Sequence, residues 1–204
     1  MLYHKTMNNY DNVHAAVVQL TTARLLLRPY QEGDYPALIA IDADDAVRHQ
    51  QGGDIISEER SQAWFRYIID KAHTEQPRTH YHFAIVERAT GDVIGRCALR
   101  LLDSDSYDGT LRQGDIGYVL ARAAWGCGYA TEAALAMIRS GFGTLGLHRI
   151  TASCRAENSA SAHVLEKLGM RREAYLWAGQ CGGGQRIDMV QYALHADEWV
   201  QCQR

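Results

Sequence analysis

Polar and apolar residues alternate over much of the chain, which is the pattern of strands that bury one face. Seven segments show this alternation, or a short apolar run in its place: 22–30, 80–88, 93–102, 113–120, 147–154, 170–177 and 186–194. Pro29 marks the first segment as an edge strand, and Thr90-Gly91-Asp92 predicts a hairpin turn between the second and the third. Gly95 indicates a bulge or a close approach of another backbone.

Apolar residues recur at helical spacing in four other segments, so we expect about four helices. Two of them begin after Asp34 and after Ser57, and the other two span residues 130–145 and 160–168. Asp34 is expected to cap the first helix, and Ser57, which two glutamates follow, to cap the second. Gly169 stands where a helix commonly ends in a left-handed residue.

The remaining segments are less regular. Residues 1–19 show no clear periodicity and are predicted to be an N-terminal extension, which leaves residues 20–200 as a single domain. Residues 42–54 are acidic and contain glycine, so we expect a loop or a short helix there. Residues 195–204 are predicted to form a short helical turn around Trp199.

Composition narrows the class of protein. The 204 residues are 47% hydrophobic and 22% charged, with a formal net charge of −3, which gives no reason to expect binding to nucleic acid or to an anionic membrane surface. No apolar run reaches the roughly 20 residues that a membrane span needs, and the first residues lack the pattern of a secretory signal. Five cysteines without a Cys-x-x-Cys pair argue against a disulfide framework and against a zinc site. We therefore expect a cytoplasmic protein with free thiols.

A glycine-rich turn at residues 125–131 joins the strand that ends at Leu120 to the helix at 130–145. The first amide groups of a helix have no intrahelical acceptor, and together with the helix dipole they favour an anion such as a phosphate. Gly126 and Gly128 lack a Cβ, so a ligand can approach the backbone closely. The alternative interpretation is a tight turn that binds nothing.

The turn nearly matches the dinucleotide fingerprint G-x-G-x-x-G, but its surroundings do not fit a dinucleotide-binding domain. The strands at 80–88, 93–102 and 113–120 are joined by turns and should be antiparallel, whereas that domain repeats parallel strand–helix units. No Lys-Ser/Thr follows the glycines, which excludes a Walker phosphate loop. A turn that holds the pyrophosphate of coenzyme A remains.

From residue 22 to residue 199 the sequence resembles the GNAT acetyltransferases, and within them the RimJ/RimL-type enzymes that acetylate protein N-termini. The resemblance rests on the order and spacing of seven segments: Thr22–Arg28, Ile94-Gly95, Asp115–Leu120, Trp125–Ala133, Gly146–Ile150, Glu157–Ser161 and Leu165–Met170. The family pattern at the turn is Q/R-x-x-G-x-G/A. Trp125 departs from its first position, as it does in other RimJ/RimL-type members.

This resemblance implies the GNAT fold, an α+β fold with three layers (α/β three-layer). Its central sheet is mixed and mostly antiparallel and has about seven strands, of which the fourth and the fifth splay apart. About four helices cover the sheet. The implied reaction is direct transfer of an acetyl group from acetyl-CoA to an amine, without a metal. The resemblance admits a homodimer, which no apolar stripe in the sequence establishes.

The resemblance also assigns coenzyme-binding residues. Backbone amides of the turn would hold the pyrophosphate: Trp125, Gly126, Cys127, Gly128, Tyr129, Ala130 and Thr131. The strand Tyr118, Val119 and Leu120 would pair with the pantetheine arm, and a backbone amide near Val119 would stabilise the charge that develops on the thioester carbonyl. Asn158 would position the coenzyme, or alternatively only cap the helix that follows it.

Catalytic candidates are fewer. Many GNAT enzymes place a tyrosine seven residues after the asparagine, where this chain has Leu165, so Ser161 becomes the candidate hydrogen-bond partner of the leaving thiolate. Ser161 could instead bond only to its own turn. Asp115 is the candidate general base, with a structural strand-end carboxylate as the alternative. We interpret Cys127 as a spacer within the turn.

The acceptor is expected to be a protein N-terminal amine, such as that of a ribosomal protein. The alternatives are a small amine (a polyamine, an amino acid or an antibiotic) and a non-catalytic sensor that binds acyl-CoA. Loops at 42–56, 103–113 and 178–186 would form the acceptor cleft, and the acidic cluster Asp42, Asp44 and Asp45 would suit a cationic acceptor or be solvated.

His80 and His82 lack a third metal ligand, and residues 103–113 resemble a calcium loop only loosely.

Overall fold

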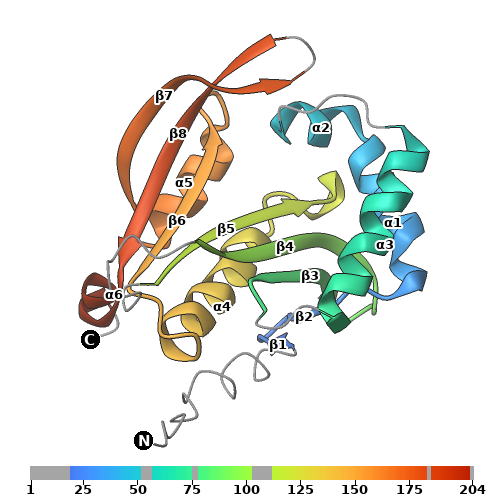
Figure 1. Ribbon diagram of the computed structural model, residues 1–204, viewed down its shortest axis with the longest axis horizontal. Coiled ribbons are helices and arrows are strands. Elements are labelled where there is room, and N and C mark those ends of the chain that lie inside the picture. The colour runs from blue at the N-terminus through green and yellow to red at the C-terminus, as the bar shows by residue number, and fades with distance from the viewer. Residues whose placement is uncertain (1–18, 52–56, 75–77, 103–111, 183–184, 203–204) are drawn as a thin grey trace, which may run out of the picture.

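The computed structural model describes residues 19–51, 57–74, 78–102, 112–182 and 185–202. Within them one sheet of eight strands has the order β1-β2-β3-β4-β5-β6-β8-β7 (Figure 1). The strands are β1 Leu20–Thr21, β2 Leu25–Arg28, β3 His80–Glu87, β4 Val93–Leu102, β5 Gln113–Leu120, β6 Arg149–Arg155, β7 Arg171–Gly182 and β8 Gln185–His195. Residues 1–18, residues 103–111 and the hairpin tip at 183–184 lie outside the described part of the chain.

The sheet is mixed and mostly antiparallel, as expected, because only β5 and β6 run parallel. It has one strand more than the sequence predicted. The segment at 22–30 does not form a single strand, because Thr22 turns the chain: its amide donates to the carbonyl of Leu25 at 2.9 Å, and its hydroxyl oxygen accepts from the Leu25 amide at 2.8 Å. The chain before this turn forms β1 and pairs with β2.

Helices cover both faces of the sheet. They are α1 Tyr35–Ala43, α2 Asp45–Gln51, α3 Glu58–Thr74, α4 Tyr129–Gly143, α5 Ser159–Lys167 and α6 Ala196–Cys202, with short 3-10 turns η1 Glu32–Asp34 and η2 Arg122–Ala124. The four expected helices are present. The segment at 42–54 contributes α2, and the predicted C-terminal turn is α6. No helix in the described ranges is both long and apolar enough to cross a membrane.

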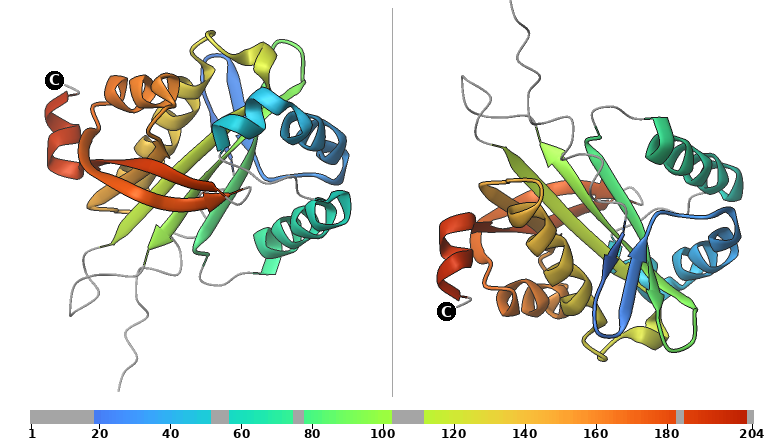
Figure 2. Two further views of the ribbon diagram at one scale, coloured as in Figure 1. Left: turned by 90° about the horizontal axis from the view of Figure 1, so that it is seen from above. Right: turned by 90° about the horizontal axis from the view of Figure 1, so that it is seen from below.

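The views in Figure 2 show three layers, with α4 and α5 on one face of the sheet and α1, α2 and α3 on the other. Strand β3 contributes to both interfaces, because successive side chains of a strand point to opposite faces. Tyr81, Phe83 and Ile85 join the core that includes α4, whereas Ala84 and Val86 join the core of α1 and α3. The three-layer GNAT fold is therefore confirmed.

Two of the three predicted helix ends are confirmed. The amide of Arg60 donates to Ser57 Oγ at 3.4 Å at the start of α3. Gly169 is left-handed, with φ of +80°, after the end of α5. Asp34 stands at the N-cap of α1 but its side chain caps nothing there, because its carboxylate instead accepts two hydrogen bonds from the guanidinium of Arg28, at 2.7 and 2.8 Å.

The sheet opens between β5 and β6. These strands pair at three positions, Gln113–Arg149, Gly114–Ile150 and Asp115–Thr151, and beyond them β5 stays paired with β4 while β6 stays paired with β8. The predicted splay is thus confirmed. Gly95 allows β4 to follow β5 to its end, since a Cβ at this position would lie 2.4 Å from the carbonyl oxygen of Val119.

Candidate active site

Two cavities meet where β5 and β6 separate. The first, of about 330 Å³, lies between the end of β5, the turn before α4, and α5; we call it the turn cavity. The second, of about 390 Å³, is lined by the rings of Tyr30, Trp64 and His82 and by residues of β4, β5 and β6; we call it the aromatic cavity. Six residues line both cavities: Gln50, Gln51, Tyr118, Val119, Asn158 and Ser161. The two cavities therefore adjoin across the opening of the sheet.

The turn before α4 presents unpaired amides. Gly126 and Gly128 have φ of +75° and +80°, a conformation that glycine adopts without steric cost. Gly128 is the N-cap of α4, and no side chain caps the helix. In the described part of the chain no protein group accepts from the backbone N–H groups of residues 126–131, and the first such bond runs from the Glu132 amide to the Gly128 carbonyl at 3.1 Å. This geometry suits an anion.

Trp125 connects the turn to the end of β5. Its indole Nε1 donates to the carbonyl of Leu120 at 3.0 Å, and its ring is 40% exposed at the turn cavity. All the predicted coenzyme-binding residues line this cavity except Cys127, which is exposed. The structure therefore gathers them in one place, as the predicted assignment requires.

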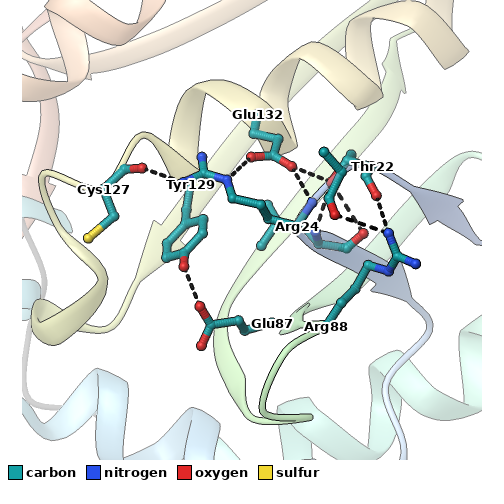
Figure 3. Close-up of polar contacts among 9 residues, drawn as sticks. Thr22, Arg24, Glu87, Arg88, Cys127, Tyr129 and Glu132 are labelled. Atoms are coloured by element: carbon teal, nitrogen blue, oxygen red, sulfur yellow. Dashed lines mark hydrogen bonds and ion pairs between the residues drawn. The ribbon is translucent and has the colours of Figure 1, made fainter.

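Arg24, in the bend just before β2, supports the turn (Figure 3). Its Nη1 donates to the carbonyl of Cys127 at 2.9 Å, and its Nε donates to Glu132 Oε2 at 2.7 Å. The guanidinium also lies 4.5 Å from the centre of the Tyr129 ring, a cation–π contact. Thr22 completes this group, because its hydroxyl donates to Glu132 Oε1 at 2.6 Å. We call Thr22, Arg24, Tyr129 and Glu132 the turn support.

The turn support keeps the carboxylate of Glu132 ionised at the start of α4. Burial alone would raise the pKa of Glu132, but hydrogen bonds from Thr22 and from the backbone and side chain of Arg24 outweigh it, so the pKa is lowered. The hydroxyl of Tyr129 binds Glu87 of β3. Sequence analysis did not identify this group, since its members are far apart in the chain and follow no periodic pattern.

Asn158 and Ser161 meet at the start of α5. Asn158 Oδ1 accepts from the Ser161 amide at 2.9 Å, so the interpretation of Asn158 as a helix cap is confirmed. The Ser161 hydroxyl does not turn back to its own loop, because its Oγ lies 3.0 Å from the hydroxyl oxygen of Tyr118. Leu165, where many relatives have a tyrosine, is 1% exposed in the core and lies within the same helix.

Asp115 lies away from this junction. It sits in the paired part of β5, accepts from Thr151 Oγ1 at 2.9 Å, and has Arg100 at 3.8 Å. Burial, its largest influence, raises the pKa of Asp115, and the contacts with Thr151 and Arg100 oppose the rise. Asp115 lines neither cavity. The structure does not bring it together with Ser161, so we favour a structural role for it.

The aromatic cavity has no carboxylate among its described lining residues, whereas Arg96 and Arg155 both line it. The acidic cluster near α2 is engaged elsewhere: Asp42 pairs with Arg96 at 2.7 Å, Asp44 accepts from the Ala46 amide at 2.8 Å, and Asp45 pairs with Arg48. These contacts occupy the carboxylates that were considered for a cationic acceptor. No group of three or more potential metal ligands occurs in the described ranges.

The profile of the acetyltransferase (GNAT) domain matches residues 24–171. The chain belongs to the GNAT acetyltransferase family. It is 30% identical to the uncharacterized N-acetyltransferase YnaD of Bacillus subtilis (strain 168) over 190 residues, which cover 89% of this chain and 99% of YnaD.

Solved structures of GNAT acetyltransferases share the fold. A GNAT acetyltransferase from Bacillus anthracis is 27% identical with a TM-score of 0.73, over 88% of this chain and 99% of that one. RimJ of Mycobacterium smegmatis, in complex with CoA-disulfide, is 24% identical with a TM-score of 0.69, over 88% and 90% of the two chains. The latter likeness shows that the two chains share the fold.

As a GNAT enzyme, this protein is an acetyltransferase that uses acetyl-CoA. The amides of residues 126–131, which have no protein acceptor in the described part of the chain, and the left-handed glycines of the turn fit a pyrophosphate. The coenzyme supplies an activated acetyl thioester; the residues of this chain bind and orient it.

Proposed function

We propose that the protein acetylates the α-amine of a protein or peptide N-terminus. The observation that carries the proposal is the absence of a carboxylate among the described lining residues of the aromatic cavity. A peptide α-amine has a pKa of about 7.7–8.0, so a useful fraction is neutral near pH 7.5, whereas a lysine or polyamine nitrogen near 10.4 depends on a base.

The turn cavity would hold acetyl-CoA in this proposal. The amides of residues 126–131 would bind the pyrophosphate, and the side-chain amide of Asn158, whose oxygen already caps α5, would face the coenzyme arm. The thioester would then reach the opening between β5 and β6, where it meets the aromatic cavity. Holding both substrates there accelerates transfer by proximity.

The register of β5 indicates which backbone groups face the opening. The Ala121 amide bonds to the carbonyl of Ile94, and Val119 lies opposite Arg96. Because bonding residues alternate along an antiparallel strand, the N–H of Val119 points to β4 and those of Tyr118 and Leu120 point to the opening. The amide expected near Val119 is therefore that of Tyr118 or Leu120, and we propose that it stabilises the carbonyl oxygen.

The test is a thiol-release assay with acetyl-CoA and a panel of acceptors. The panel holds peptides with a free α-amine, the same peptides with the α-amine blocked but a lysine present, free amino acids, and spermidine. We expect release only with free α-amines. Turnover of spermidine or of blocked peptides without turnover of free peptides contradicts the proposed acceptor. Binding of CoA in calorimetry with no release on any acceptor supports a non-catalytic sensor instead.

A further inference from the structure

Two hydroxyl groups lie at the junction of the two cavities. The hydroxyl oxygen of Tyr118, from β5, is 3.0 Å from Oγ of Ser161, from α5, and both residues line both cavities. They come from the elements on the two sides of the opening, so the contact spans it. A hydroxyl can donate one hydrogen bond and accept others, so two in contact can pass a proton between them.

The surroundings hold the two hydroxyls in place. The Ser161 amide is fixed by Asn158 Oδ1 at 2.9 Å, which sets the hydroxyl in the first turn of α5, where the helix dipole favours a negative charge. Tyr118 is mostly buried, and burial raises its pKa to about 12, against an opposing effect of its bond to Ser161. The phenol is therefore protonated at neutral pH and able to donate.

Of the six residues that line both cavities, only Tyr118 and Ser161 carry a hydroxyl group. A carboxylate lines neither cavity in the described part of the chain, and Asp115 is bonded to Thr151 away from them. Leu165 is buried in the core and carries no polar atom in its side chain. Acetyl transfer nevertheless requires that the acceptor nitrogen lose a proton and that the departing sulfur gain one.

We propose that Tyr118 and Ser161 form a two-hydroxyl relay that carries the proton of the acceptor amine to the departing sulfur of coenzyme A. The proposal rests on the proposed function above, which places the amine in the aromatic cavity and the thioester in the turn cavity. Ser161 is the member that contacts the sulfur, and Tyr118 acts through Ser161, so Tyr118 is a positioning and relay residue.

The relay balances within one turnover. The nitrogen lone pair forms the carbon–nitrogen bond, and the electron pair of the carbon–sulfur bond leaves with sulfur. Ser161 gives its hydroxyl proton to that sulfur, and Tyr118 gives its proton to the Ser161 oxygen. The proton released from nitrogen restores the Tyr118 hydroxyl. One proton has moved from nitrogen to sulfur, both hydroxyls end as they began, and no external base is consumed.

The experiment compares Ser161→Ala, Tyr118→Phe and the double variant with the unaltered protein. Tyr175→Phe is the matched control, because it removes a hydroxyl that donates to Asp188 at 2.9 Å and lines neither cavity. The first readout is the thiol pKa of bound coenzyme A, followed through the ultraviolet absorbance of the thiolate. The second is kcat with a free peptide, and the third is the affinity for coenzyme A by calorimetry.

We expect Ser161→Ala to raise the thiol pKa by about one and to lower kcat by roughly 100-fold. Tyr118→Phe should lower kcat by about tenfold and raise the thiol pKa less, with coenzyme affinity unchanged. The double variant should be no slower than Ser161→Ala, because the two act as one unit, whereas Tyr175→Phe should change nothing. Ser161→Thr, which keeps the hydroxyl, should restore most of the rate.

The relay is wrong if Tyr118→Phe leaves both the thiol pKa and kcat unchanged. It is also wrong if the fold-loss of kcat in the double variant equals the product of the losses in the two single variants. Melting temperatures within the range of the control exclude misfolding as the cause. If the unaltered protein acetylates no peptide, the proposed function fails, and the thiol titration of bound coenzyme A still decides whether the hydroxyl pair acts on the sulfur.

Discussion

The guanidinium of Arg24 donates from Nη1 to the carbonyl oxygen of Cys127 at 2.9 Å, although 103 residues separate them in the chain. The same guanidinium binds Glu132 and lies over the Tyr129 ring, so one side chain from the bend before β2 fixes both the turn and the first turn of α4. Arg24 therefore determines how the unpaired amides of the turn are aimed, without itself lining the turn cavity.

Replacing Arg24 should weaken coenzyme binding. We expect Arg24→Ala to raise the Kd for coenzyme A by about threefold to tenfold, because the turn loses its support and the Glu132 carboxylate loses the guanidinium that balances its charge. Arg24→Lys should be intermediate, since one ammonium does not reproduce a planar fork. Calorimetry measures both. Arg171→Ala, which breaks the 2.7 Å pair with Glu198, is the control and should leave the Kd unchanged.

A side chain at Gly128 should prevent coenzyme binding. Gly128→Asp adds a negative charge at the turn, with its Cβ 3.5 Å from Nη2 of Arg24, so it competes for the guanidinium that supports the turn and repels the phosphates. We expect the Kd for coenzyme A to rise by at least about 100-fold. Gly91→Asp is a matched control, because Gly91 has φ of +81°, close to the +80° of Gly128, in the β3–β4 hairpin. The two variants share the backbone strain. Equal affinity in both would remove the turn from the coenzyme site.

Asp115 should contribute to pH-dependent stability and not to catalysis. Burial raises its pKa in the folded protein, so the folded state holds the proton more tightly than the unfolded chain. Ionisation of the Asp115 carboxyl therefore lowers the free energy of unfolding as pH rises from the pKa of Asp115 in the unfolded chain through its pKa in the folded protein. We expect Asp115→Asn to be more stable relative to the unaltered protein at pH 7 than below pH about 4, with turnover retained.

Urea unfolding at several pH values measures this difference. If the unfolding free energy of Asp115→Asn minus that of the unaltered protein falls as pH rises toward neutral, the assigned sign is wrong. Loss of turnover in Asp115→Asn with normal coenzyme affinity restores Asp115 as the candidate base.

Leu165 should not accept the tyrosine that many relatives have at this position. The side chain is 1% exposed and lies between the main core and the wall of the aromatic cavity. Leu165→Tyr must therefore either displace core side chains or push its phenol into the cavity, and should cost about 1–3 kcal/mol of stability. Leu165→Met conserves volume and should cost less than about 1.5 kcal/mol. Thermal unfolding of both variants tests the difference. A Tyr variant as stable as the Met variant means that the site has room for a phenol.

Local patterns predicted most of the elements correctly. Strand β3 alternates cleanly and packs on two cores, and the α4 segment has its apolar residues at helical spacing, so the sequence was sufficient for both. The opening between β5 and β6 came from the family resemblance, because nothing in the two strands themselves tells that they part after Asp115. Strand β1 was missed, since two residues carry no periodicity.

The site was predicted in outline and not in its contacts. The glycines of the turn and Asn158 are recognisable because they lie in short segments of the chain. Arg24 binds Glu132, and Tyr118 binds Ser161; in each pair the two residues are more than 40 positions apart, so no local sequence pattern could predict the contact. Asp34 was mispredicted although its partner is near in the chain: the ion pair with Arg28, six positions earlier, takes up the carboxylate that was expected to cap α1.

The three residue pairs between β5 and β6 are the whole ladder that joins the two parts of the sheet. The amides of Tyr118 and Leu120 face the gap, so we expect them to exchange with deuterium faster than the amides of β5 that pair with β4. A molecule that lodges in the gap and accepts from these amides should slow their exchange, so exchange at these two positions should report whether the gap is occupied.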